Sequence, residues 1–272
     1  MKREVSWILK EKFNDNPNGQ FKKDRKRLKK GEPVDYIIGF KEFLGCRIDL
    51  SKKPLIPRPE TEFWVQKVIQ EIYYKCDDRQ NYSIRVLDMF AGSGCIGIAI
   101  LKHLPNAKVV FADNSKKFLE QIKINCKINK IPKNRYKIIQ SDVFSNITFT
   151  SILQSIEVNV KYDYIFANPP YIATTTLLRR KLRKGKGKNE IQESVLKYEP
   201  HSALFGGKDG LVYIRKFLAK AKNFLKPSGR IFMEFDSLQK KEIENLLEEL
   251  KYKNWDFHKD QYRKSRYLVI VI

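Results

Sequence analysis

The fold of this 272-residue chain is decided by residues 86–97, which read Val-Leu-Asp-Met-Phe-Ala-Gly-Ser-Gly-Cys-Ile-Gly. An apolar strand runs into a glycine-rich turn, and an apolar helical pattern follows. Gly92 and Gly94 let the backbone approach a ligand closely, and the N-terminus of the next helix presents free N–H groups. The G-x-G-x-x-G spacing is weak when taken alone. As part of a strand, turn and helix, it predicts a nucleotide-type ligand.

Asp88 lies just before this glycine-rich turn. A dinucleotide would place its pyrophosphate at such a turn, and the carboxylate would repel it. The same carboxylate would attract, directly or through water, the ammonium group of a cofactor that carries an amino acid. The turn therefore favours S-adenosylmethionine over NAD.

Two further acidic residues end the next predicted strands. Asp113 follows the apolar run 108–112, where we expect it to accept hydrogen bonds from both ribose hydroxyls of the cofactor. Asp142 ends the run 136–141, where it can accept from an adenine amino group, with Val143 against the ring. A single aspartate at a strand end is usually a turn or helix cap. Three at successive strand ends, after a glycine-rich turn, indicate a ligand site.

A second motif lies at residues 162–171, which read Tyr-Asp-Tyr-Ile-Phe-Ala-Asn-Pro-Pro-Tyr. The two prolines fix φ and hold Asn168 extended at the end of an apolar strand. The nitrogen of an amide or exocyclic amine is a poor nucleophile because its lone pair is delocalised. Asn168 Oδ1 and the Pro169 carbonyl can orient such an NH2 group, and Tyr171 offers an aromatic face. An ordinary strand-ending turn is the alternative, but the neighbouring glycine motif favours chemistry.

After residue 60, predicted helices and strands alternate, which is typical of a mainly parallel sheet covered on both faces. Ligands of such sheets bind at the carboxyl ends of the strands. No clear crossover helix separates the last two strands, so we expect them to pair antiparallel. The predicted strands are 84–89, 107–112, 136–141, 162–167, 229–235, 254–259 and 266–272, and the predicted helices are 61–75, 94–104, 115–129, 208–225 and 237–250.

The sequence before this unit divides into two parts. Residues 1–36 are basic, and strong turn chemistry at 14–19 leaves room for one or two helices at most. Residues 37–58 contain two short extended runs, 37–43 and 46–50, that predict a β-hairpin before a proline-rich segment. We therefore expect a helical extension at 1–36, a hairpin region at 37–58 and an α/β domain at 59–272.

With these motifs the chain resembles the HemK/PrmC family of S-adenosylmethionine-dependent methyltransferases, which modify the glutamine of the Gly-Gly-Gln motif in peptide chain release factors. The resemblance runs from about Pro33 to the C-terminus. The Asn-Pro-Pro-Tyr element is shared with DNA and RNA amino-methyltransferases, whereas other segments are more particular to the family. Those segments are Leu-Ile-Pro-Arg-Pro-Glu-Thr-Glu at 55–62, Tyr-Glu-Pro at 198–200 and Ala-Leu-Phe-Gly-Gly-Lys-Asp-Gly at 203–210.

The resemblance implies a Rossmann-like methyltransferase fold with a seven-stranded, mainly parallel sheet and an antiparallel last strand. It implies that Asn168, Pro169, Pro170 and Tyr171 hold the substrate glutamine. It also implies S-adenosylmethionine as cofactor, and with the strand-end residues the expected cofactor-binding set is Phe90, Ala91, Gly92, Ser93, Gly94, Asp113, Asp142, Val143 and Asn168. Family members usually carry a longer helical N-terminal domain than the 35 or so residues found here.

Composition agrees with a globular enzyme, since 42% of the residues are hydrophobic. No apolar run of about 18 residues is present, so we expect no transmembrane span. The basic N-terminus contains acidic residues and has no apolar signal core, which indicates a cytoplasmic location and leaves a mitochondrial matrix location open. We expect a monomer. The four cysteines contain no C-x-x-C pair and the three histidines are scattered, so we expect no metal site.

The formal net charge is +23, from 54 basic and 31 acidic residues. Such a field draws acidic partners or nucleic acid, but a lysine-rich genome can produce the same composition. The densest basic run lies at 179–188, directly after the Asn-Pro-Pro-Tyr motif. It is either a solvated loop or a clamp on the release factor, on ribosomal RNA or on transfer RNA.

These features predict methyl transfer from S-adenosylmethionine to the side-chain amide nitrogen of the release-factor glutamine. One alternative is an amino-methyltransferase that acts on adenine N6 or cytosine N4 in nucleic acid, although the chain has little length for a target-recognition region. The other alternative is a non-catalytic RNA- or ribosome-binding module with the same fold.

Overall fold

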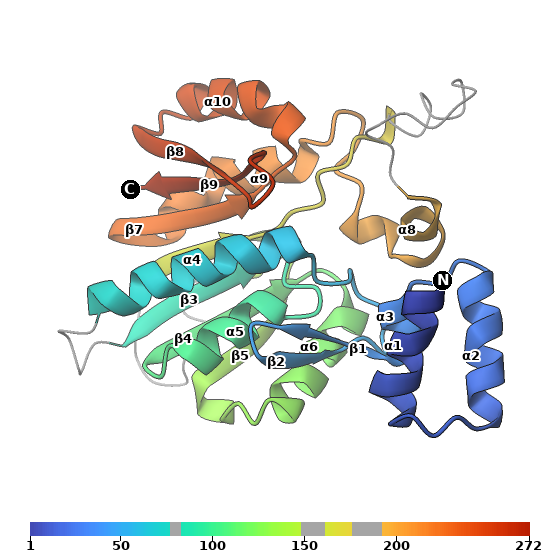
Figure 1. The fold of residues 1–272 in the computed structure, drawn as a ribbon. Helices are drawn as coiled ribbons and strands as arrows, with labels where there is room; N and C mark the ends of the chain where they lie inside the picture. The colour runs from blue at the N-terminus through green and yellow to red at the C-terminus, as the bar shows by residue number, and fades with distance from the viewer. Residues whose placement is uncertain (77–82, 148–160, 176–191) are drawn as a thin grey trace.

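One seven-stranded sheet organises the structure, a computed structural model that describes residues 1–76, 83–147, 161–175 and 192–272 (Figure 1). The strands lie in the order β5-β4-β3-β6-β7-β9-β8. Their bounds are β3 Ile84–Met89, β4 Ala107–Asp113, β5 Tyr136–Gln140, β6 Tyr162–Ala167, β7 Leu225–Glu234, β8 Asn254–Lys259 and β9 Ser265–Val271. Apolar runs bounded by turn residues formed strands close to where the sequence predicts them.

The strand directions confirm the predicted methyltransferase-type sheet. β3 pairs in parallel with both β4 and β6, and the parallel pairing continues to β5 on one side and to β7 on the other. β9 runs antiparallel between β7 and β8. Since β3, β4, β5 and β6 point the same way, their carboxyl ends and the loops after them meet at one edge.

Helices cover both faces of the sheet, as its alternating buried side chains require. On one face, β3 turns Val86 toward α4 Pro59–Cys76, α5 Cys95–His103 and α6 Lys116–Ile128. On the other face, Leu87 and Met89 pack with α9 Val212–Ala221 and α10 Lys240–Glu249. No helix in the described ranges is long and apolar enough to cross a membrane.

The N-terminal region contains two helices, α1 Lys2–Phe13 and α2 Gly19–Lys29, and a short third helix, α3 Val34–Ile38. The first two confirm the helical prediction, and Asn18 caps α2 by accepting a hydrogen bond from the Gln20 backbone N–H at 2.9 Å. The prediction of an extended run from residue 37 was wrong at its start. Ile37 is buried in a small cluster with Ile8 and Leu28, so tertiary packing favours the helix there.

The hairpin itself is confirmed as β1 Phe40–Phe43 and β2 Cys46–Asp49, paired antiparallel. Two polar side chains of α6 attach it to the domain. Asn125 Oδ1 accepts from the Asp49 backbone N–H at 2.8 Å, and Gln121 Oε1 accepts from the Lys52 backbone N–H at 2.8 Å. The basic run at 179–188 lies outside the described residues.

Candidate active site

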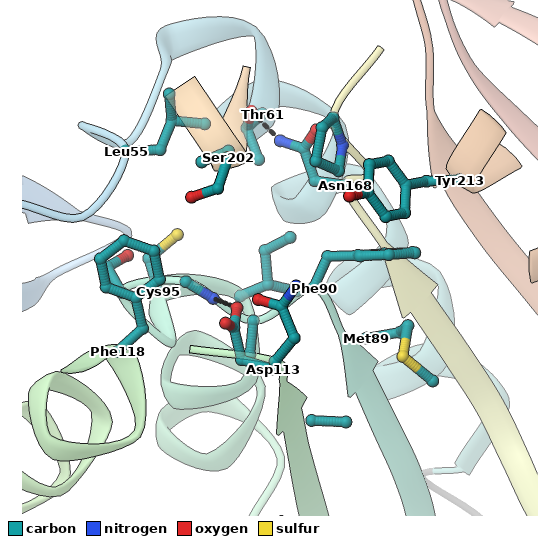
Figure 2. A pocket seen from close by; sticks show the side chains of 18 of the residues that line it. Leu55, Thr61, Met89, Phe90, Cys95, Asp113, Phe118, Asn168, Ser202 and Tyr213 are labelled. Atoms are coloured by element: carbon teal, nitrogen blue, oxygen red, sulfur yellow. Dashed lines mark hydrogen bonds between the residues drawn. The ribbon is translucent and has the colours of Figure 1, made fainter. Parts of the chain in front are cut away.

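A cavity opens at the carboxyl ends of β3, β4 and β6, where parallel sheets bind ligands (Figure 2). The space between its walls, including the part that is open solvent, is about 840 Å³. Figure 2 shows Thr61, Asn168 and Ser202 on one side, with Cys95, Phe90 and Asp113 opposite them. The predicted residues that line this cavity are Phe90, Ala91, Gly92, Ser93, Asp113, Asp142, Val143, Asn168 and Pro170. Three other predicted residues, Gly94, Pro169 and Tyr171, are not among the described residues that line the cavity.

The glycine-rich turn bends sharply after β3. Phe90 has a φ of 60°, which is unusual for a bulky residue, and Gly92 and Gly94 have φ values of 53° and 78°. The Phe90 ring packs edge-on against Tyr213 and Phe217, both at 6.1 Å between ring centroids. Aromatic packing thus holds a backbone conformation that leaves the turn open toward the cavity.

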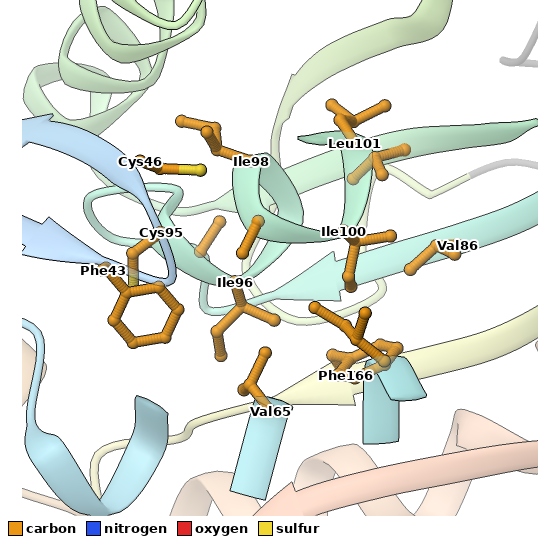
Figure 3. Close-up of a cluster of buried hydrophobic side chains, with 14 of the residues drawn as sticks. Phe43, Cys46, Val65, Val86, Cys95, Ile96, Ile98, Ile100, Leu101 and Phe166 are labelled. Carbon is orange, nitrogen blue, oxygen red and sulfur yellow. The ribbon is translucent and has the colours of Figure 1, made fainter. Parts of the chain in front are cut away.

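The helix after the turn, α5, is buried on several sides, as Figure 3 shows. Phe43 and Cys46 of the hairpin, Val65 of α4 and Phe166 of β6 surround it. Gly97 is required for this packing, because a Cβ atom there would lie 2.3 Å from Phe111 Cε1. The third glycine of the motif therefore serves helix–sheet packing.

Asp88 differs from the sequence-based expectation. It is only 1% exposed and is not one of the described residues that line the cavity. Its Oδ2 accepts a hydrogen bond from the Gly97 backbone N–H at 2.9 Å. Burial raises the pKa of this carboxyl group to about 7. The expected attraction of a cofactor ammonium is corrected: Asp88 supports the first turn of α5 from beneath.

Asp113, at the end of β4, faces the cavity. Its Oδ2 accepts from the Gly92 N–H and its Oδ1 accepts from the Ser115 N–H, both at 2.9 Å. Burial raises the pKa of Asp113, and these backbone hydrogen bonds oppose the rise. A carboxylate has about four lone pairs, so Asp113 keeps acceptor capacity for a ligand beside the backbone N–H groups of Gly92, Ser115 and Asn114.

Asp142 and Val143 line the cavity after β5. Asp142 is exposed and lies 3.4 Å from the Lys216 ammonium. Val143 is buried with a φ of 52°, a second strained backbone position on the cavity wall. Ile96, Phe118 and Val143 are apolar residues of the cavity lining.

The turn after β6 places Asn168 on the cavity wall. Its Nδ2 donates to Thr61 Oγ1 at 3.4 Å, and Thr61 belongs to the first turn of α4 (Figure 2). Gly206 packs tightly behind the turn, because a Cβ atom there would lie 2.4 Å from the Pro170 carbonyl oxygen. A glycine-rich segment about 35 residues away in the sequence thus fixes the turn.

Tyr171 is oriented differently from the prediction that it offers an aromatic face to the substrate. Its hydroxyl donates to Glu234 Oε1 at 3.1 Å. Its ring packs against the apolar cluster on the face of the sheet that α9 and α10 cover. Glu234 is 1% exposed at the end of β7, and its Oε2 accepts from Thr61 Oγ1 at 2.6 Å and from Trp64 Nε1 at 2.8 Å. Burial raises the pKa of Glu234, which these hydrogen bonds oppose.

An ion pair joins two of the three family-particular segments, 55–62 and 198–200, at the cavity wall. The Arg58 guanidinium lies 2.6 Å from Glu199 Oε1, and Glu199 Oε2 accepts from the Ile56 N–H at 3.1 Å. Glu199 is buried, whereas Arg58 is half-buried and lines the cavity. Arg58, which has no role in the sequence-based predictions, is part of the cavity wall.

Sequence reasoning also missed Thr61, Glu234 and Tyr213. Glu234 carries a signal that was available, since it ends the apolar run 231–233 as Asp113 ends its own strand. Thr61 lies in the segment 55–62, but its hydroxyl bonds Glu234 of β7, and the local sequence of α4 does not show this contact.

The chain is similar to known methyltransferase domains in sequence and in fold. Residues 75–181 match the family described as "Methyltransferase small domain". In the solved N-terminal domain of human METTL16 in complex with SAH, the fold is similar at a TM-score of 0.54 and 14% identity, over 84% of this chain and 76% of that one.

Two release factor glutamine methyltransferases are much more similar in sequence. The protein from Flavobacterium psychrophilum is 35% identical over 90% of this chain and 77% of its own length. The protein from Lactococcus lactis subsp. lactis is 31% identical over 98% of this chain and 88% of its own length. These identities extend over nearly the whole chain, and this protein therefore belongs to the release factor glutamine methyltransferase family.

Proposed function

We propose that this protein transfers a methyl group from S-adenosylmethionine to the side-chain amide nitrogen of the glutamine in the Gly-Gly-Gln motif of a peptide chain release factor. One observation carries the proposal. The Asp113 carboxylate and the Asn168 amide, which have different chemistry, line the same cavity at the carboxyl edge of the sheet. The first suits a ribose and the second suits a planar NH2 group.

The residues of the cavity fit S-adenosylmethionine. The Asp113 carboxylate keeps acceptor capacity for ribose hydroxyls, while backbone N–H groups hold it in place. Ile96, Phe118 and Val143 line the cavity and can supply apolar surface for the adenine ring, and Asp142, next to Val143 in the sequence, can accept from its amino group. We assign the cofactor to these residues together with the turn at 90–94.

The bound cofactor supplies a methyl group on a positively charged sulfur, which is already activated for transfer. In this proposal Asn168 Oδ1 accepts a hydrogen bond from the substrate NH2 group. The Pro169 carbonyl, which lies between two residues that line the cavity, is the proposed second acceptor, so that the nitrogen faces the cofactor. Positioning of this kind can contribute on the order of 7 to 11 kcal/mol in well-aligned systems. Pro170 and Tyr171 complete the rigid turn, with Tyr171 held by Glu234.

Glu234 is not a suitable general base, although it lies close to the turn. Its two oxygens accept hydrogen bonds from Thr61, Trp64 and Tyr171 and are buried away from the cavity. We therefore assign no general base. The amide proton leaves to water after the methyl group has been transferred.

The finer assignments belong to the same proposal. We take the protein to act as a cytoplasmic monomer, and we take the basic run 179–188 to assist substrate binding through acidic protein or RNA surfaces. The net charge of +23 supports such a contact. Salt screening weakens contacts between exposed charges. If catalytic efficiency is unchanged between low and moderate salt, the proposed contact between the basic run and the substrate is wrong.

Radiolabelled S-adenosylmethionine tests the reaction directly. The protein is incubated with a release factor that carries Gly-Gly-Gln, with the same factor changed to Gly-Gly-Ala, and with total RNA and DNA. The proposal predicts label on the Gly-Gly-Gln factor alone. Equal labelling of both factors, or labelling of nucleic acid only, would contradict it.

A further inference from the structure

The orientation of the Asn168 amide matters for the proposed reaction, on which this inference depends. An amide carries an acceptor oxygen and a donor NH2 group of nearly the same size. If the oxygen faces the cavity, it can accept from a substrate amide. If the amide is turned over, two NH2 groups face each other and the substrate is repelled.

The structure contains a chain of hydrogen bonds that distinguishes these two orientations. Glu234 Oε2 accepts from both Trp64 Nε1 and Thr61 Oγ1, at 2.8 Å and 2.6 Å. The Thr61 hydroxyl proton is thereby used on Glu234, so its oxygen can only accept from Asn168. The contact from Asn168 Nδ2 to Thr61 Oγ1 is 3.4 Å long.

We propose that Glu234 and Thr61 are positioning residues that turn the Asn168 amide so that its Oδ1 faces the substrate. Thr61 is 2% exposed and Glu234 is 1% exposed, so water does not compete for either group. Among the described residues, none other than Thr61 forms a hydrogen bond with the Asn168 side chain. The acceptor that the substrate meets is thus set by a carboxylate two hydrogen bonds away.

The donors and acceptors in this series of hydrogen bonds stay the same when Glu234 takes up a proton on Oε1. Two donors already point at Oε2, so a proton on this carboxyl group would reside on Oε1, toward the Tyr171 hydroxyl. Tyr171 can accept as well as donate, and Thr61 would still donate to Oε2. Thr61 donates to Oε2 both when Glu234 is charged and when a proton sits on Oε1, so the orientation of Asn168 is the same in these two forms.

The test compares Thr61→Val, which has nearly the same shape but no hydroxyl, with Thr61→Ser, which keeps one. Loss of a single orienting hydrogen bond should lower kcat roughly five- to tenfold in Thr61→Val, and Thr61→Ser should restore it to within about twofold. The Kd for S-adenosylmethionine should change less than about twofold in both variants, since Thr61 orients the acceptor and not the cofactor.

Tyr252→Phe serves as the matched control. It removes another buried hydroxyl, which donates to the Leu218 carbonyl at 2.6 Å on the α9 side of the sheet. It should lower the melting temperature without lowering kcat. A similar loss of kcat in Tyr252→Phe would show that reduced stability alone explains the effect, and wild-type kcat in Thr61→Val would also overturn the inference.

A measurement on the unaltered protein tests the chain even if Thr61→Val does not fold. Nuclear Overhauser contacts are expected between the Asn168 side-chain amide protons and the Thr61 methyl group, and their absence would overturn the inference. Failure of the wild-type protein to label Gly-Gly-Gln would instead contradict the proposed function, and the Overhauser contacts would still test the orientation of Asn168.

Discussion

The ends of β3 and β4 are adjacent and each carries an aspartate, yet the two carboxylates have different surroundings. Asp88 is buried beneath the glycine-rich turn, where it accepts from Gly97. Asp113 lies one strand further along, holds the same turn through Gly92, and faces the cavity. In the ladder Asp88 pairs with Phe111, so Asp113 lies two residues further along its own strand.

The burial of a carboxylate at a strand end depends on the path of the loop that follows the strand. The turn after β3 folds back over Asp88 and closes it off, and Ala91 N–H donates to the Ala112 carbonyl at 3.0 Å. The chain after β4 leaves through Ser115 into α6, which keeps Asp113 open to the cavity. Removing the Asp113 carboxylate should therefore affect cofactor binding, whereas removing the Asp88 carboxylate should affect stability.

The largest expected effect is on cofactor binding. Asp113→Ala removes the proposed ribose acceptor and the anchor of Gly92, so affinity for S-adenosylmethionine should fall roughly 100-fold, as expected for two hydrogen bonds to a charged group. Isothermal calorimetry measures this change. Asp256→Ala, an exposed aspartate of β8, is the control. Wild-type affinity in Asp113→Ala would remove this residue from the cofactor site.

The second effect is on stability and concerns the support beneath the turn. In Gly97→Ala the new methyl group meets Phe111 at 2.3 Å and Val109 at 2.9 Å, both of which are buried. Overpacking should lower the free energy of unfolding by about 1 to 3 kcal/mol. Denaturant melts measure it, with Gly19→Ala as the control because nothing lies within 4 Å of its added Cβ. Equal stability of the two variants would contradict this packing.

The third effect depends on pH. Since burial raises the pKa of Asp88 to about 7, the folded protein keeps a proton there that the unfolded chain has released above about pH 4. The contribution of Asp88 to stability therefore falls as the pH rises from about 4 to about 7.

Asp88→Asn removes this titration and keeps an oxygen that can accept from Gly97. Its stability relative to the wild-type protein should increase through the same pH range and level off above about 7. Denaturant melts at several pH values compare the two proteins, and the other titrating groups cancel because both proteins contain them. A difference that stays constant with pH would show that Asp88 is charged throughout.

The smallest effect is expected at the end of β5. Asp142 is exposed, and its ion pair with Lys216 should contribute at most about 1 kcal/mol to stability. Asp142→Ala should weaken cofactor binding only about fivefold, through one hydrogen bond to the adenine amino group. A loss as large as that of Asp113→Ala in the same calorimetric titration would mean that the two carboxylates share one role.

Much of the fold follows from local sequence pattern. The strands at 84–89 and 162–167 were predicted at their observed bounds, because each is an apolar run that ends in a strong turn. β7 begins four residues before its predicted start at 229. The Pro-Ser-Gly at 227–229 has turn chemistry, yet it lies within the strand, whose pairing with β6 shifts register near Tyr162 and Tyr164.

The site was predicted less completely, because its contacts join distant parts of the chain. Asp113 and Asn168 were accessible from sequence, since each ends an apolar strand beside a recognisable turn. The contacts of Glu234 with Thr61 and of Glu199 with Arg58 span 173 and 141 residues, and local pattern cannot show them. Asp88 had the same local signal as Asp113, and only the folded turn separates their roles.

The central claim is that Asn168 presents an acceptor to the substrate amide while Asp113 holds the cofactor. Single-turnover methylation of a Gly-Gly-Gln release factor by Asn168→Ala, with the cofactor saturating, tests it most directly. We predict a rate constant lowered roughly a hundredfold or more, by analogy with a lost oxyanion-hole contact, with cofactor affinity reduced much less. An unchanged rate constant in Asn168→Ala would contradict the account.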